Sequence, residues 1–201
     1  MAKISYLFTL SLLFLAACAD GRFLVIELPD RQAELYPKAH TNNEVTVAVD
    51  EVDDRERAWK YFGADLVGSD ITPVIIIISN HSKSQLLVNP ANILLRRGSS
   101  VIDPIPVVVV SNFVKRDYGF MSDDTETKID QYFSDISFSE AVVEPGENYQ
   151  GVMFFKLEKP RNSDSYFQTI SLYSQRLKLN MIIPERDSNQ RLRFGPYALS
   201  Y

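Results

Sequence analysis

Apolar residues recur along the chain with the two-residue period of β-strands from residue 45 onward. Between residues 45 and 49, valines at alternate positions flank Thr46 and Ala48, which is typical of a strand with one buried face. Residues 74–78 are all β-branched, which indicates a central strand buried on both faces. Similar runs predict further strands at 85–88, 92–97, 137–143, 151–157, 169–172 and 177–183. From Pro184 onward the chain is polar, and we expect no further strand there.

Turn-forming residues separate these strands. Asn89-Pro90, Gly98-Ser99-Ser100 and Pro145-Gly146-Glu147 each combine residues that favour the backbone angles of tight turns. Short strands joined by tight turns, with few helices between them, favour antiparallel pairing in two packed layers. The pattern therefore predicts a mainly β fold, an antiparallel immunoglobulin-like β-sandwich with one or two short helices.

One helix is expected between residues 53 and 62. Asp53 or Asp54 can accept the free N–H groups of its first turn, and Gly63 suits its end. Trp59, the only tryptophan of the chain, lies near Ala58 and Phe62 at helical spacing. We expect Trp59 to fill the core.

Residues 104–135 carry opposing patterns. Residues 107–110 are four valines with strand propensity, whereas Pro104 and Pro106 favour the start of a helix, so we interpret 104–116 as strand-like or mixed. Residues 117–135 hold six acids against one base. We expect this segment to be irregular, with a short helix near 128–133.

Four aromatic residues lie within the acidic segment and are candidate partner-binding residues: Tyr118, Phe120, Tyr132 and Phe133. Exposed aromatic side chains supply much contact area in protein interfaces. The alternative is that they fix the segment to the core of the domain. Oxygen ligands for calcium could come from the acids Asp123, Asp124, Glu126 and Asp130. Their spacing lacks the glycine and terminal glutamate of a helix-loop-helix calcium site, so we assign no metal.

The N-terminus has the layout of a secretory signal. Lys3 precedes an apolar run from Ile4 to Leu15, and small residues follow at positions 16 and 17. Twelve helical residues span about 18 Å at about 1.5 Å per residue. A bilayer core is about 30 Å thick, so the run is too short to span it.

The tetrapeptide Leu15-Ala16-Ala17-Cys18 resembles the lipobox of bacterial lipoproteins. The resemblance implies that a signal peptidase recognises Leu15, Ala16 and Ala17, cleaves before Cys18, and leaves Cys18 carrying lipid. It divides the chain into a signal peptide (1–17), a lipidated tether (18–43) and a β-sandwich domain (44–201). Within the tether, residues 23–28 form an apolar piece that can dock as an edge strand. The alternatives are an ordinary signal peptide with a chance cysteine, or an uncleaved anchor.

The residue after the lipidated cysteine influences sorting in this family, and aspartate there favours the inner membrane. This chain has Ala19 at that position and Asp20 one residue further on. The resemblance therefore implies the outer membrane, with the domain facing the periplasm. Residues 62–66, 71–74 and 78–80 also resemble a pattern of small uncharacterised bacterial lipoproteins with an immunoglobulin-like β-sandwich, which implies no activity.

Charge and composition remove several classes of function. The chain has 21 bases and 26 acids, a net charge of −5. Cleavage before Cys18 would remove Lys3 and leave −6, so no excess of basic charge is available to bind nucleic acid or a membrane surface. One cysteine and two histidines, with no nucleophile elbow and no phosphate-binding glycine motif, favour no enzyme class and no cofactor.

These observations predict a lipid-anchored protein of the bacterial envelope. We expect a non-enzymatic binding or assembly module that contacts another envelope protein through an edge strand or through residues 117–135. The alternatives are an envelope hydrolase, an inhibitor of such a hydrolase, or a purely structural lipoprotein.

Overall fold

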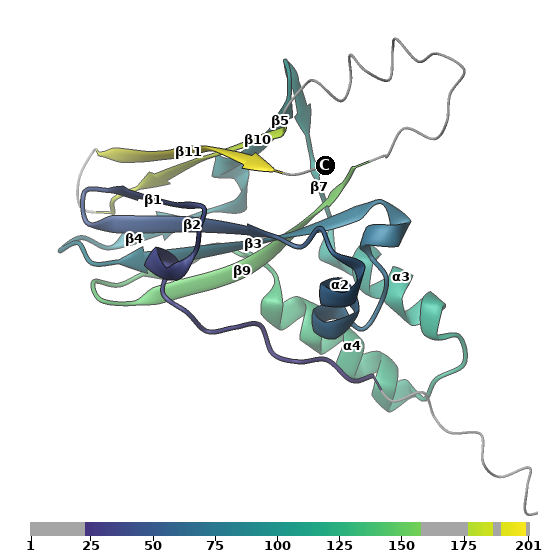
Figure 1. The fold of residues 1–201 in the computed structure, drawn as a ribbon. Coiled ribbons are helices and arrows are strands. Elements are labelled where there is room, and N and C mark those ends of the chain that lie inside the picture. The colour runs from purple at the N-terminus through teal and green to yellow at the C-terminus, as the bar shows by residue number, and fades with distance from the viewer. Residues whose placement is uncertain (1–22, 158–176, 187–189, 200–201) are drawn as a thin grey trace, which may run out of the picture.

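Three antiparallel sheets form the framework of the protein in the computed structural model, which describes residues 23–157, 177–186 and 190–199 (Figure 1). The large sheet has the order β1-β2-β3-β9-β7, made of Ala39–Asn42, Val45–Glu51, Ile71–Asn80, Asn148–Lys156 and Pro104–Ile105. The second sheet has the order β11-β10-β5-β6, made of Arg191–Leu199, Leu177–Pro184, Ile93–Arg97 and Ser100–Ile102. A two-stranded sheet pairs β4 (Leu86–Val88) with β8 (Ala141–Val143).

Helices cover the face of the large sheet that points away from the second sheet (Figure 1). The α-helices are α2 (Arg55–Phe62), α3 (Val107–Tyr118) and α4 (Asp123–Ile136). Short 3-10 turns are η2 (Ala33–Leu35), η3 (Val67–Ser69) and η4 (Pro90–Asn92). The mainly β class and its antiparallel, sandwich-like sheets are confirmed, and the immunoglobulin-like form stays a prediction.

The central strand β3 is buried on both faces, as its unbroken apolar run predicts. Val74, Ile76 and Ile78 point into the core between the two sheets. Ile75 and Ile77 point into a second core beneath the helices. Because successive side chains on a strand alternate between faces, one β-branched run supplies both cores.

Helix α2 confirms the predicted helix and its ends, and contradicts the prediction for Trp59. The Asp54 side chain accepts the N–H of Arg57 at 2.8 Å, and Gly63 ends the helix at φ 67°. The helix buries Ala58, Tyr61 and Phe62. Consecutive helical residues point about 100° apart, so Trp59, next to Ala58, turns outward and is 48% exposed.

Residues 104–136 are more helical than expected. The strand β7 ends at Ile105, because Pro106 has no N–H to continue the ladder and its fixed φ suits a helix start. The four valines therefore open α3, whose buried residues are Val110, Ser111 and Val114. The short helix expected near 128–133 is confirmed, but the irregular structure expected for the rest of the acidic segment is wrong. The Ser122 side chain accepts the Thr125 N–H and starts α4, which extends to Ile136.

Residues 23–43 were predicted to form a tether with one docking piece at 23–28, and in the structure they pack against the domain along most of this length. Strand β1 pairs with β2, with Ala39 opposite Ala48 and Asn42 opposite Val45. Ala33 is fully buried. The Ile26 N–H donates to the Lys60 carbonyl at 2.9 Å, so residues 23–28 dock without forming a strand. The domain thus begins at least twenty residues before the predicted boundary at 44.

Strand β11 lies where no strand was expected. It buries Leu192, Phe194, Tyr197 and Leu199 in the core between the sheets. The Tyr197 hydroxyl donates to the Val47 carbonyl at 2.9 Å, which joins the second sheet to the large sheet. The strand predicted at 169–172 lies outside the described residues.

Candidate functional site

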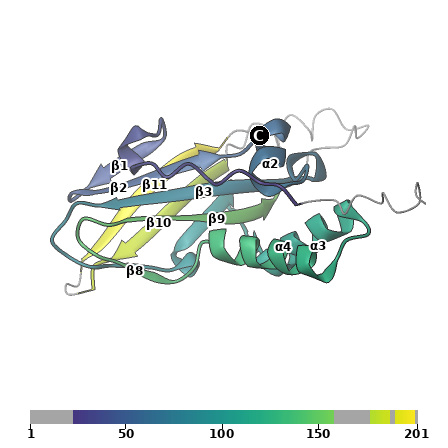
Figure 2. The ribbon, with the colours of Figure 1, turned by 90° about the horizontal axis from the view of Figure 1, so that it is seen from below.

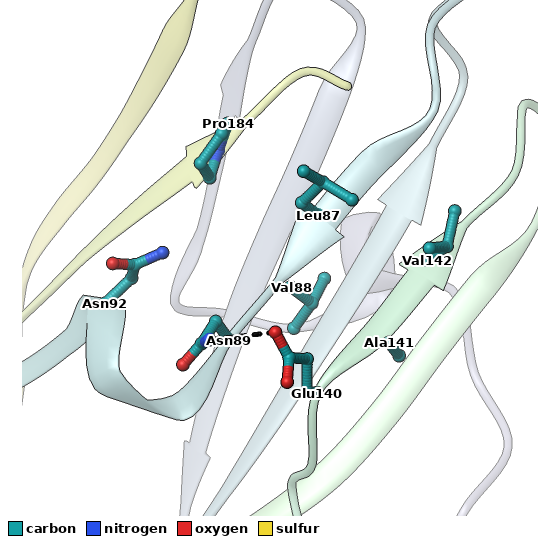
Figure 3. Close-up of a pocket in the computed structure, with 8 residues that line it drawn as sticks. All are labelled: Leu87, Val88, Asn89, Asn92, Glu140, Ala141, Val142 and Pro184. Atoms are coloured by element: carbon teal, nitrogen blue, oxygen red, sulfur yellow. Dashed lines mark hydrogen bonds between the residues drawn. The ribbon is translucent and has the colours of Figure 1, made fainter. Parts of the chain in front are cut away.

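A pocket of ≈ 500 Å³ opens beside the two-stranded sheet (Figure 3). Most of its wall is apolar, and the polar groups are two asparagine amides and one carboxylate. The lining residues are Leu87, Val88, Asn89, Asn92, Glu140, Ala141, Val142 and Pro184. Amides and a carboxylate can bond to the backbone of a ligand, while the apolar wall accepts a side chain.

Hydrogen bonds hold this pocket in shape. The Asn89 side chain accepts the Ala91 N–H at 2.8 Å and donates to Glu140 Oε1 at 3.1 Å (Figure 3). This pair ties η4 to the start of β8. At the other end of the sheet, Gln85 Nε2 donates to Glu144 Oε1 at 2.7 Å. The β4–β8 pair is therefore fixed at both of its ends.

A buried asparagine joins the two-stranded sheet to the large sheet. Asn80, at the end of β3, is fully buried, and its Nδ2 donates to the carbonyls of Ser84 (2.9 Å) and Val143 (3.0 Å). A buried amide left without partners would cost about 1–3 kcal/mol, so these bonds position β4 and β8 against β3.

The outer face of the two-stranded sheet is apolar. Leu87 and Val142 stand opposite each other in the register and are 37% and 42% exposed. Within the described residues, β8 pairs with β4 and with no other strand. An edge strand with exposed apolar side chains is a ready template for pairing with another chain. The sequence predicted contact through an edge strand without identifying which strand, and it did not predict this pocket.

The predicted aromatic residues separate into three environments. Phe133 is fully buried and lies against Phe62 and Phe154 at ring distances of 6.3 and 5.9 Å. Tyr118 and Tyr132 are partly buried in the core beneath the helices. Phe120, by contrast, is 103% exposed. Buried Phe133 is not available to a partner, so the alternative that these aromatics fix the segment to the core describes three of the four.

Phe23, in the N-terminal segment, packs against the two partly buried tyrosines, Tyr118 and Tyr132. Its ring lies 5.9 Å from that of Tyr118 and 5.6 Å from that of Tyr132, edge-on in both cases. The Tyr132 hydroxyl donates to the Tyr61 carbonyl, and burial raises the pKa of that hydroxyl strongly. Burial therefore favours the neutral hydroxyl that donates this hydrogen bond.

The acids considered for calcium do not converge. Asp123, Asp124 and Glu126 occupy the first turn of α4, where negative charge suits the helix dipole. Lys128 pairs with Asp124, and Lys115 pairs with Asp130 at 2.8 Å. No group of three or more His, Cys, Asp or Glu side chains placed to hold a metal occurs among the residues that the structure describes.

The two histidines take part in separate local contacts. His81 Nε2 lies 3.1 Å from Glu34 Oε1 at the surface. His40, within the segment predicted to be a tether, lies on β1 with its ring 4.5 Å from that of Tyr197. Leu15, Ala16, Ala17 and Cys18 lie outside the described residues. Of the helices in the described ranges, none is long and apolar enough to cross a membrane.

Comparisons with known proteins give distant structural neighbours. No protein-family model matches the chain, and no curated protein matches it in sequence. It is similar to ycdA of Bacillus subtilis, provisionally assigned to the lipoproteins, with 11% identity and a TM-score of 0.42 over 78% of this chain and 37% of that one. The yjhA protein of Bacillus subtilis has 10% identity and a TM-score of 0.39, over 73% and 79% of the two chains. Likeness at this level carries no argument about function.

Proposed function

We propose that this chain is a lipid-anchored protein of the bacterial envelope that binds another envelope protein without catalysing a reaction. The lipobox-like sequence ending at Cys18 supports the anchor, and Ala19 after it supports the outer membrane with the domain in the periplasm. The observation that supports binding is the exposed pair of Leu87 on β4 and Val142 on the edge strand β8, beside a pocket.

The binding mode we propose is addition of an extended segment of the partner to strand β8. Strand addition gains affinity from backbone hydrogen bonds and specificity from pockets that take alternate side chains. The β4–β8 edge can supply the bonds, and the neighbouring pocket can take an apolar side chain. Asn89 and Glu140 then offer polar contacts at the rim.

The anchor is tested by substituting Cys18. Cys18→Ser removes the thiol that would carry lipid. Firm attachment to a membrane needs more than one acyl chain, so a protein without lipid on residue 18 should not stay bound. We expect the wild-type protein to incorporate labelled palmitate and to sediment with outer membranes, and Cys18→Ser to do neither. Palmitate labelling that persists in Cys18→Ser would contradict the assignment of Cys18.

The edge is tested by charge. Val142→Lys places a cation on the edge of β8, a substitution that opposes strand pairing. In cells carrying a photo-crosslinking residue at position 87, we expect one dominant envelope partner, and at least a tenfold loss of that crosslink with Val142→Lys, corresponding to about 1.4 kcal/mol.

Val101→Lys is the matched control, because Val101 is a comparably exposed valine (46%) on β6 of the second sheet. It should leave the crosslink unchanged. Equal loss in both variants, or crosslinks to cell-wall fragments in place of a protein, would remove the support for strand addition and favour the structural or hydrolytic alternatives.

A further inference from the structure

The turn between α3 and α4 holds one apolar side chain entirely in solvent. Phe120 is 103% exposed, the highest value among the large apolar residues of the described chain. The turn is short: α3 ends at Tyr118, Gly119 follows at φ 73°, and Ser122 caps α4. A methyl group built on Gly119 would meet no atom within 4 Å, so the turn projects clear of the fold.

This projection is rigid. Both helices are docked through buried residues, Val110 and Val114 on α3 and Ile129 on α4. The ion pair between Lys115 and Asp130 joins them on the outside. Because both helices are held in place, the turn between them keeps Phe120 exposed at the surface.

The N-terminal end of the described chain is fixed beside the same turn (Figures 1 and 2). Phe23 is wedged among Tyr118, Tyr132 and Gly63, where a methyl group on Gly63 would lie 2.7 Å from the Phe23 ring. Such close packing leaves residue 23 little freedom to move away from the helix pair.

Covalent geometry then limits the distance to the lipid. Cys18 precedes Phe23 by five residues. A fully extended chain spans at most about 3.6 Å per residue, so the Cys18 backbone lies within about 18 Å of Phe23. A lipid-bearing cysteine sits at the membrane interface, so the α3–α4 end of the domain must lie close to the bilayer.

We propose that the α3–α4 turn contacts the lipid surface, with Phe120 inserted into the interfacial layer of the membrane. This inference rests on the proposed lipidation of Cys18. Aromatic and leucine side chains on membrane-bound surfaces bury about 5–10 Å into this layer. Leu24, next to Phe23, is 74% exposed and adds apolar surface at the same end.

The net negative charge around the turn gives no electrostatic attraction to anionic lipid, so the contact depends on the apolar side chain of Phe120. Residues 115–130 carry three bases and five acids, a net charge of −2. An anionic lipid surface repels such a segment, so Phe120 would insert only shallowly and the lipid on Cys18 would supply the attachment.

The inference also orients the binding edge. Helix α4 has fourteen residues, which span about 21 Å at 1.5 Å per residue. It runs from the α3–α4 turn toward the start of β8 (Figure 2). With Phe120 at the membrane, the β4–β8 edge lies near the other end of this helix from the lipid contact, which leaves it open to a partner in the aqueous space.

Depth-dependent fluorescence quenching tests this contact. The chain has one tryptophan, Trp59, so Trp59→Phe with Phe120→Trp gives a lipidated protein whose tryptophan emission comes from the turn alone. The protein, purified from membranes, is reconstituted into phosphatidylcholine vesicles that contain lipid with brominated acyl chains. The control carries Trp59→Phe with Val142→Trp, which places the probe on β8.

We expect the bromolipid to quench the tryptophan at position 120, whose emission should lie to the blue of that from position 142 because insertion removes it from water. The tryptophan at position 142 should not be quenched. Vesicle-bound protein whose position 120 is not quenched would overturn the lipid contact, with the anchor intact. Protein that carries no lipid and does not float with vesicles would overturn the anchor, and the inference with it.

Discussion

Phe133→Ala is expected to lower the free energy of unfolding by about 3–5 kcal/mol, the range for truncating a buried phenylalanine. Phe133 is fully buried on α4 and packs against Phe62 of α2 and Phe154 of β9. Removing its ring leaves a cavity where α4 meets the large sheet. Urea unfolding of the domain, followed by circular dichroism, measures the change.

Phe120→Ala is the matched control, because it removes the same ring from the neighbouring turn. Phe120 is fully exposed, and surface substitutions of this kind change stability by about 0.5 kcal/mol or less. Equal losses in the two variants would mean that Phe120 is packed against the protein, which would contradict the solvent exposure on which the membrane contact depends.

The contrast between these two residues shows where sequence reasoning succeeds and stops. Both belong to the same acidic segment, and their residue type alone does not distinguish them. The helical spacing of Thr125, Ile129 and Phe133, four residues apart, is the signal for the buried face of α4. No such spacing includes Phe120, which lies between the two helices.

Strand β11 was missed because the chain after Pro184 is rich in polar residues and because the alternation of buried residues within the strand is interrupted. Its buried residues are Leu192 and Phe194, then Tyr197 and Leu199. The pairing with β10 shifts between Leu179 and Met181, where β11 contains one extra residue. Such a bulge moves every later side chain to the opposite face, so a strict two-residue period fails across it.

Helix α3 shows local propensity overridden by its surroundings. Four consecutive valines favour a strand, yet the edge of β9 that they could join is taken by β7, which stops at the proline preceding them. The buried pair Val110 and Val114, four residues apart, docks the segment as a helix instead. The β9 edge lies about forty residues further along the chain, so local sequence alone does not show that β7 occupies it.

The exposed apolar residues of the candidate binding edge could have been predicted in part from the sequence. Strands β4 and β8 each place adjacent apolar residues side by side, Leu86-Leu87-Val88 and Val142-Val143. Because neighbouring side chains on a strand face opposite ways, one residue of each run must point away from the core. The sequence does not reveal that Leu87 and Val142, the outward residues, lie opposite each other on paired strands and line the same pocket.

Gly151→Ala is expected to lower the free energy of unfolding by about 1–3 kcal/mol and to weaken partner binding at β8 as well. A Cβ at Gly151 of β9 would lie 2.6 Å from Cα of Phe138, a contact with backbone that no side-chain rotation relieves. The Phe138 N–H donates to the Val152 carbonyl at 2.9 Å, so the clash falls where the chain between α4 and β8 is held to the large sheet.

Both effects of Gly151→Ala have one cause, because displacing Phe138 displaces β8, which begins three residues later. Urea unfolding measures the first effect, and the crosslink from position 87 measures the second. Gln150→Ala, one residue earlier on β9 and half-buried, should change neither by more than a surface substitution does. A Gly151→Ala protein with a weakened fold and an undiminished crosslink would show that the partner does not depend on the position of β8, and would contradict strand addition at that edge.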